Sequence, residues 1–212
     1  MERYRFDVAA DRLYHFFWHE YADWYIELVK PELQAEALVR DHAVAVLLEV
    51  HDRVLRLLNP FVPFVTEEIW QALPQRPDDG RSASGSDQTI TLSAFPTPEP
   101  GWVDEEAVAV MALLQAVTTG VRTVRSEWGV PPAQKIAALI QGADTDTEAI
   151  LRAHASHVVR LAGLEDLAFA SEVERSPDTV RRVVRDFQIH IPLAGIVDRA
   201  KEAARVRRDL DR

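Results

Sequence analysis

The chain has 212 residues, of which 47% are hydrophobic and 27% charged, a composition typical of soluble globular proteins rather than disordered or fibrous ones. It contains no cysteine, which excludes disulfides, thiol catalysis and Cys-ligated metal sites and fits a reducing, cytoplasmic compartment. The net charge of −10 argues against wrapping nucleic acid around the whole surface, although a local arginine patch stays possible. We expect no signal peptide and no membrane-spanning segment.

The N-terminal part of the chain has the periodicity of long helices. Apolar and aromatic residues recur at three- and four-residue steps over 8–29, and Lys30-Pro31 ends this helix because proline disfavours helical backbone in the residue before it. A second helix is predicted over 36–58. A third, shorter helix is predicted to begin with Thr66 as its N-cap.

A polar stretch separates these helices from the strongest helical pattern in the chain. Residues 75–88 are small, polar and turn-forming, which predicts a flexible surface loop, and 89–92 are expected to be extended. An apolar stripe at alternating steps of four and three then predicts a helix over 104–128. Gly129 stands at its C-terminal end.

After Pro132 the pattern changes to one typical of a small α/β module. Strands are expected over 135–140, 166–170 and 180–191, with a helix over 147–162 that Gly163 ends. The predicted fold class is therefore mainly α, in three parts: a helical bundle over 1–130, a small α/β module over 131–195, and the start of an exposed C-terminal helical arm over 196–212.

No catalytic motif is found in the sequence. A glycine-rich phosphate loop, a nucleophile elbow and a His-Glu-x-x-His zinc motif are all absent. His15 and His19 could share a metal on one helical face, but two exposed polar residues beside an aromatic core explain them more simply. The aromatic residues over 16–25 could stack nucleic-acid bases, whereas their spacing favours core packing. We predict no catalytic and no metal-binding residue.

Two arginines mark the end of the predicted helix over 104–128. Arg122 and Arg125 lie three residues apart, and Lys135 follows the Pro131-Pro132 turn. Guanidinium groups beside a rigid turn suit successive phosphates of a nucleic acid. A solvated helix face with an ion pair to Glu127 is an equal alternative.

Several segments, in order along the chain, resemble the valyl-tRNA synthetase family within the class I aminoacyl-tRNA synthetases. The segment N-P-F-V-P-F-V-T-E-E-I-W is similar to the wider subgroup for Val, Ile, Leu and Met. The segments D-W-Y-I-E-L-V-K-P and I-P-L-A-G-I-V-D point more narrowly to the valine branch. The resemblance covers nearly the whole chain, and its segments are residues 17–20 with 23–31, 57–70, 121–127 with 130–132, and 191–198.

The resemblance implies a domain that binds the anticodon arm of tRNA-Val and works beside a catalytic domain. In that family the whole enzyme couples valine to its tRNA with ATP and Mg2+, but the active-site signatures and the editing domain are not found here. The chain alone would therefore be inactive and hold no cofactor. The resemblance further implies two groups of tRNA-binding residues: Lys30, Arg40 and His42 at the turn between the first two long helices, and Arg122, Arg125 and Lys135 as backbone contacts.

Two alternatives stay open. The chain could be the equivalent domain of an isoleucyl-tRNA synthetase, although that family often carries a Cys-ligated zinc and this chain has no cysteine. It could also be a free-standing helical module that binds protein, which its acidic balance supports. Salt-sensitive binding that is selective for tRNA-Val would separate the first reading from both.

Overall fold

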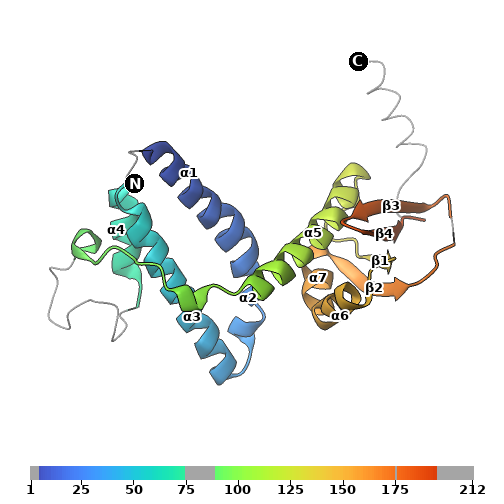
Figure 1. Ribbon diagram of the computed structural model, residues 1–212, viewed down its shortest axis with the longest axis horizontal. Coiled ribbons are helices and arrows are strands. Elements are labelled where there is room, and N and C mark those ends of the chain that lie inside the picture. The colour runs from blue at the N-terminus through green and yellow to red at the C-terminus, as the bar shows by residue number, and fades with distance from the viewer. Residues whose placement is uncertain (1–4, 75–88, 175, 195–212) are drawn as a thin grey trace, which may run out of the picture. The chain divides into compact units, whose positions relative to one another are not determined.

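The computed structural model describes residues 5–74, 89–174 and 176–194, and the chain divides into two compact units, Met1–Pro100 and Gly101–Arg212 (Figure 1). The described part is mainly helical with one four-stranded sheet, which confirms the predicted fold class. The predicted flexible loop over 75–88 and the predicted C-terminal arm over 196–212 lie outside the described residues.

The first unit is a helical hairpin followed by a short helix. A continuous helical stretch precedes a short 3-10 turn, and the chain then returns along a second long helix. The π-helical turns in the first stretch have no signature in the spacing of its apolar residues. The elements are α1 (Phe6–His15), the π-helix η1 (Phe16–Ile26), α2 (Glu27–Val29), the 3-10 helix η2 (Glu32–Gln34), α3 (Ala37–Leu58), α4 (Pro63–Ala72) and the 3-10 helix η3 (Ile90–Leu92).

A buried carboxylate joins α3 to α4. Asp52, on α3, is 6% exposed and accepts a hydrogen bond from Trp70 Nε1 at 2.7 Å. Its other oxygen accepts from Arg56 Nη2 at 2.5 Å, and Arg56 Nη1 donates to the carbonyl of Ala94. Trp70 packs with Leu55 in the core of this unit. The carboxylate is therefore buried with two donors, which offsets the cost of removing it from water.

The prediction that Thr66 caps α4 is wrong. The helix begins at Pro63, where the missing N–H of proline costs no intrahelical hydrogen bond. Thr66 lies one turn inside, is buried, and donates from Oγ1 to the carbonyl of Val62 at 2.9 Å. Asn59 Nδ2 donates to the same hydroxyl at 3.0 Å, so Thr66 connects the end of α3 to the first turn of α4.

The prediction of an extended segment over 89–92 is also wrong, because this stretch forms η3. Glu67 holds it against α4: Thr89 Oγ1 donates to Glu67 Oε2 at 2.5 Å, and the N–H of Ile90 donates to the same oxygen at 3.1 Å. Gln71 Nε2 donates to Oε1 of the same carboxylate at 2.7 Å. One carboxylate on α4 thus anchors the start of η3 to this helix.

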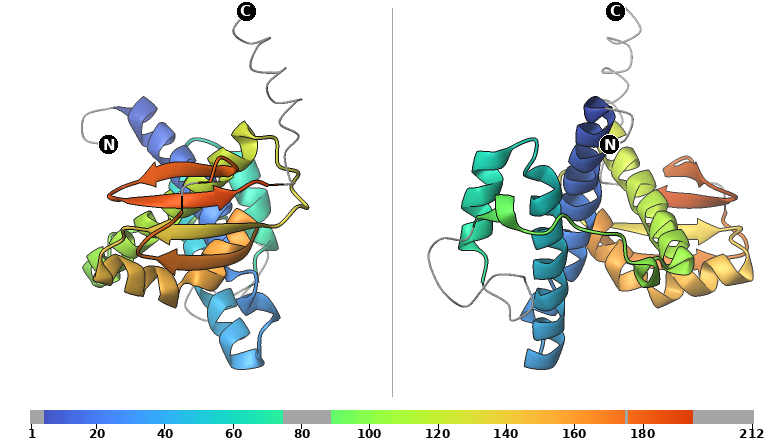
Figure 2. Two further views of the ribbon diagram at one scale, coloured as in Figure 1. Left: turned by 90° about the vertical axis from the view of Figure 1, so that its right-hand side faces the viewer. Right: turned by 60° about the vertical axis from the view of Figure 1, so that its left-hand side comes forward.

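The second unit places helices against one face of a mixed sheet (Figure 2). Strand β1 is parallel to β2 and antiparallel to β4, which pairs with β3 in an antiparallel hairpin, so the strand order is β2-β1-β4-β3. The elements are the 3-10 helix η4 (Pro100–Trp102), α5 (Glu105–Glu127), β1 (Ile136–Gln141), α6 (Thr145–Ala153), α7 (Ala155–Ala162), β2 (Leu164–Ala170), β3 (Thr179–Val184) and β4 (Phe187–Pro192).

Helix α5 belongs to the second unit, whereas we expected it to complete a bundle extending to residue 130. Val117 and Val121 are fully buried in one core with Ile140 and Ile189 from the sheet. The apolar stripe that the sequence shows is therefore covered by strands formed after residue 131. By length and composition α5 could also cross a membrane, but its packing against the sheet accounts for its apolar character.

Two predicted elements of this unit are each divided in the structure. The strand expected over 180–191 is a hairpin, whose turn contains Arg185 with a φ of 49°. The helix expected over 147–162 breaks at His154, which separates α6 from α7. Gly163 ends α7 in the left-handed conformation, as the sequence predicts.

Candidate nucleic-acid interface

The structure places the first group of predicted tRNA-binding residues at one end of the helical hairpin in the first unit. Lys30 follows the last residue of α2, Arg40 lies in the first turn of α3, and His42 follows it, all three exposed. The 3-10 helix η2 packs against α3, so the connection and the start of α3 form a single end of the hairpin (Figure 1).

Carboxylates accompany the cations at this end. Lys30 Nζ lies 2.5 Å from Glu27 Oε1, and Arg40 donates from Nε and Nη2 to Asp41 Oδ1 at 3.1 and 3.0 Å. Over its described residues the first unit has six lysines and arginines against thirteen aspartates and glutamates. This end is therefore not a strongly positive surface. Lys30 and Arg40 are exposed, and each is held by a weak surface ion pair.

The second predicted group lies in the second unit, where Arg125 is held by backbone carbonyls. Its Nη1 donates to the carbonyls of Gln134 at 2.9 Å and Gly163 at 3.0 Å. Its Nη2 donates to the carbonyls of Pro131 at 2.8 Å and Pro132 at 3.2 Å. The guanidinium group thus joins the turn after α5 to the turn after α7. Four of its five N–H donors face the protein, which supports a structural role.

Arg122 and Lys135, the other two residues of this group, differ from Arg125 in their surroundings. Arg122 donates from Nε to the carbonyl of Leu161 at 3.0 Å, so it too contacts the end of α7. Lys135 directly precedes β1, and its side chain is exposed. Glu127, which the sequence suggested as an ion-pair partner for the two arginines, has its Oε1 3.6 Å from Arg182 Nη1. The structure therefore brings Arg122 and Arg125 to one turn, and their contact with phosphate stays a prediction.

The aromatic residues of α1 and η1 differ in burial, and base stacking by the exposed ones stays a prediction. Tyr21 is buried, donates to the carbonyl of Leu47 at 3.3 Å and stacks on Phe17; burial raises its pKa to about 12. His51 packs against both rings, and burial lowers its pKa. In contrast, Tyr14 and Trp18 stack on each other with ring planes 4° apart and stay more than half exposed.

The predicted metal alternative finds little support in the geometry. His15 Nε2 lies 3.8 Å from Asp11, and His19 Nδ1 lies 3.5 Å from Asp23, so each imidazole faces its own carboxylate. Within residues 5–74, 89–174 and 176–194, no group of three or more His, Cys, Asp or Glu side chains could hold a metal ion.

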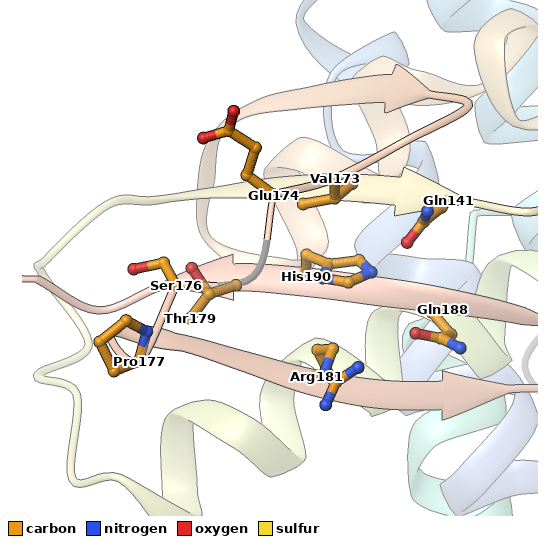
Figure 3. Close-up of a pocket in the computed structure, with 9 residues that line it drawn as sticks. All are labelled: Gln141, Val173, Glu174, Ser176, Pro177, Thr179, Arg181, Gln188 and His190. Atoms are coloured by element: carbon orange, nitrogen blue, oxygen red, sulfur yellow. The ribbon is translucent and has the colours of Figure 1, made fainter.

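Sequence reasoning missed a basic hairpin in the second unit. Arg181 and Arg182 lie on β3, and Arg185 lies in the turn before β4. Arg181 borders a polar pocket that also contains His190 and Gln188 (Figure 3). The signal was the sequence R-R-V-V-R over 181–185, which we assigned to the interior of one strand.

Comparison with known proteins shows which family the chain resembles. Residues 1–140 match the model of the anticodon-binding domain of tRNA ligase. Among curated proteins, the chain is 39% identical to the valine–tRNA ligase of Syntrophotalea carbinolica, with 99% of this chain and 23% of that protein covered. The valine–tRNA ligases of Desulfotalea psychrophila and Geobacter sulfurreducens are 37% and 36% identical, with 97% and 99% of this chain covered and 22% and 23% of those proteins. The chain thus spans just under a quarter of the length of these relatives.

Proposed function

Since the chain belongs to the anticodon-binding domain family of tRNA ligases, we propose that it binds the anticodon arm of tRNA-Val and works within a cytoplasmic valine–tRNA ligase. The match of residues 1–140 to that family carries the proposal. The identity of 36–39% to valine–tRNA ligases over nearly the whole chain favours tRNA-Val over another tRNA. The chain's role is to position the RNA, and a catalytic domain elsewhere in the enzyme carries out aminoacylation.

The end of the hairpin near Lys30 and Arg40 can exchange its carboxylate partners for phosphates. Side chains of both residues are about half exposed, and surface ion pairs of this kind contribute only about 0–1 kcal/mol. Breaking the Lys30–Glu27 and Arg40–Asp41 pairs therefore costs little when a phosphate approaches. The surrounding acidic charge opposes any further phosphate contact, so selectivity depends on the bases rather than on charge alone.

Whole valine–tRNA ligases use ATP, and we propose that they use Mg2+ with it. The described residues of this chain offer no cluster of ligands suited to a metal, so no step of that chemistry is assigned to them.

The test is the binding of the 212-residue chain to three RNAs: tRNA-Val, tRNA-Val with a changed anticodon, and tRNA-Ile. We expect tRNA-Val to bind most tightly. In a plot of log K against log salt concentration, the two phosphate contacts of Lys30 and Arg40 with a single-stranded loop should contribute about −1.4 to the slope. Equal affinity for all three RNAs at low salt would contradict the proposal, and a preference for tRNA-Ile would replace valine by isoleucine.

A double variant, Lys30→Gln with Arg40→Gln, tests the residues themselves. It should weaken tRNA-Val binding about tenfold and make the salt slope shallower by about 1.4, the share of these two contacts. Arg152→Gln is the matched control, because Arg152 forms the same kind of exposed ion pair with Glu148 on α6. If the control weakens binding as much as the double variant, these two residues are not the contact.

A further inference from the structure

A polar pocket lies on the face of the sheet opposite the helices. Along β4, Ile189 and Ile191 point into the core shared with α5, and His190 between them points to the other side. Four residues of the chain between β2 and β3 also line the pocket: Val173, Glu174, Ser176 and Pro177 (Figure 3). The pocket therefore has a floor of strand residues and a wall of connecting chain.

The floor presents hydrogen-bonding groups in a fixed arrangement. Gln141 on β1 pairs directly with Gln188 on β4, and Arg181 on β3 pairs directly with His190 on β4. Directly paired side chains on one face of antiparallel strands have Cβ atoms about 4.5–5.5 Å apart. The two amides are therefore neighbours in one row, and the guanidinium and imidazole groups are neighbours in the next.

Two atoms of these groups lack a partner among the described residues. Gln141 Nε2 donates to the carbonyl of Ser171 at 3.2 Å, which orients the amide, and no described residue bonds its oxygen. His190 is 5% exposed, and its Nε2 is buried without a hydrogen bond. Burial, and then the charge of Arg181, lowers the pKa of His190, so the ring is neutral at pH 7. A native fold leaves few buried polar groups unpaired, and among the described residues that line the pocket His190 Nε2 is one, so the floor favours a polar occupant.

Positive charge lies at the edge of the pocket. Arg181 faces the pocket from the edge strand β3, and Arg185 lies in the turn that follows. Glu174 is the one acidic residue among the nine that line the pocket, and its carboxylate points away from the imidazole ring (Figure 3). An anionic group beside polar atoms able to read a flat heterocycle is the chemistry of a nucleotide.

The size of the pocket limits the occupant. Its volume of about 400 Å³ lies near the lower end of the 300–1,000 Å³ typical of ligand sites. Seven of the nine lining residues are polar or charged, so an apolar ligand is disfavoured. We propose that the pocket holds one unpaired nucleotide of RNA, with its base on the amides of Gln141 and Gln188 and its phosphate on Arg181. This inference rests on the proposed function and adds a second RNA contact outside the hairpin of the first unit.

An acidic peptide is the competing occupant. Strand β3 is an edge strand, and such a strand can add another strand through its free backbone groups. Strand addition would use the outer edge of β3 and leave the amides of Gln141 and Gln188 unused. The polar floor and the unpaired groups therefore favour the nucleotide.

The experiment measures tRNA-Val binding by the full chain and by three variants. Arg181→Gln and Gln188→Ala should each weaken binding about tenfold, because each removes a contact to phosphate or base. The control Arg152→Gln should bind within about twofold of wild type. Circular dichroism and the melting temperature establish that the variants are folded.

The outcomes separate this inference from the proposed function. If wild type binds tRNA-Val and both variants bind equally well, the pocket is not an RNA contact and the proposed function stands. If wild type binds no tRNA, both fall. Two further probes, free nucleoside monophosphates and a glutamate-rich peptide, are added to isotope-labelled protein and followed by the amide resonances of β3 and β4. Saturation by either probe at a lower concentration than tRNA-Val overturns the RNA assignment.

Discussion

Replacing Arg125 with lysine tests whether this residue supports the fold or contacts RNA. Lysine keeps the charge, but a single ammonium group cannot reach the carbonyls of both turns, after α5 and after α7, at once. Four hydrogen bonds are involved, and three of them are exposed to solvent, so water replaces them in part. At about 0.5–1 kcal/mol for each bond, we expect the free energy of unfolding of the second unit to fall by about 2–4 kcal/mol.

The assay is differential scanning calorimetry of the full chain with and without Arg125→Lys. For a unit of this size, 1 kcal/mol shifts the melting temperature by about 4–8 °C, so the transition of the second unit should fall by about 8–32 °C. Val121→Ala, which opens a cavity in the core of the same unit, identifies that transition. An unchanged melting temperature together with weaker tRNA binding would refute the structural role and support a phosphate contact, because lysine cannot reproduce the bidentate contact of arginine with phosphate.

Three further predictions follow from the buried polar groups and from one turn. Asp52→Ala leaves Arg56 and the indole N–H of Trp70 without their shared acceptor and should destabilise the first unit by about 3–5 kcal/mol in urea denaturation. Gly163→Ala places a Cβ at a φ of 70° and should cost about 1–2 kcal/mol, read as a lower melting temperature of the second unit. Because the pKa of His190 is lowered in the folded state, the unfolded chain binds more protons below pH 6.5 and stability should fall with falling pH; His190→Gln should flatten that decrease in melts at several pH values.

The sequence predicted the helices well because their stops are local. Proline at position 31 and glycine at 163 act through the backbone of one or two residues, so they are visible without a structure. The hairpin of β3 and β4 was missed because its turn contains Arg185 and Asp186 rather than glycine or asparagine. Alternation of side chains alone does not show that a strand reverses.

The local sequence of a helix does not show which element packs against its apolar stripe. The periodicity of α5 predicts a buried helix face, but a bundle and a sheet bury the same face equally well. Only the pairing of Val121 with residues such as Ile189, far along the chain, decides between them. For this reason the predicted domain boundary at residue 130 differs from the observed boundary, which lies between Pro100 and Gly101.

Contacts of the candidate site, too, could be predicted from the sequence only where the partners are close along the chain. The carboxylates beside Lys30 and Arg40 are three and one residues away, respectively, so their ion pairs could have been expected from the sequence. The acceptors of Arg125 are carbonyls, which every residue carries, and nothing in the sequence marks the carbonyl of Gly163 as one of them. Likewise, Gln141 and Gln188 become neighbours only through the pairing of β1 with β4.

The contacts of Glu67 give this chain a practical site for engineering. Because that carboxylate holds Thr89 and Ile90 against α4, the two sides of residues 75–88 are anchored independently of what joins them. The entropy of closing a longer connection grows only with the logarithm of its length. A peptide tag or a small reporter domain inserted there should leave the hairpin intact, and would allow the protein to be tethered or imaged without modifying either terminus.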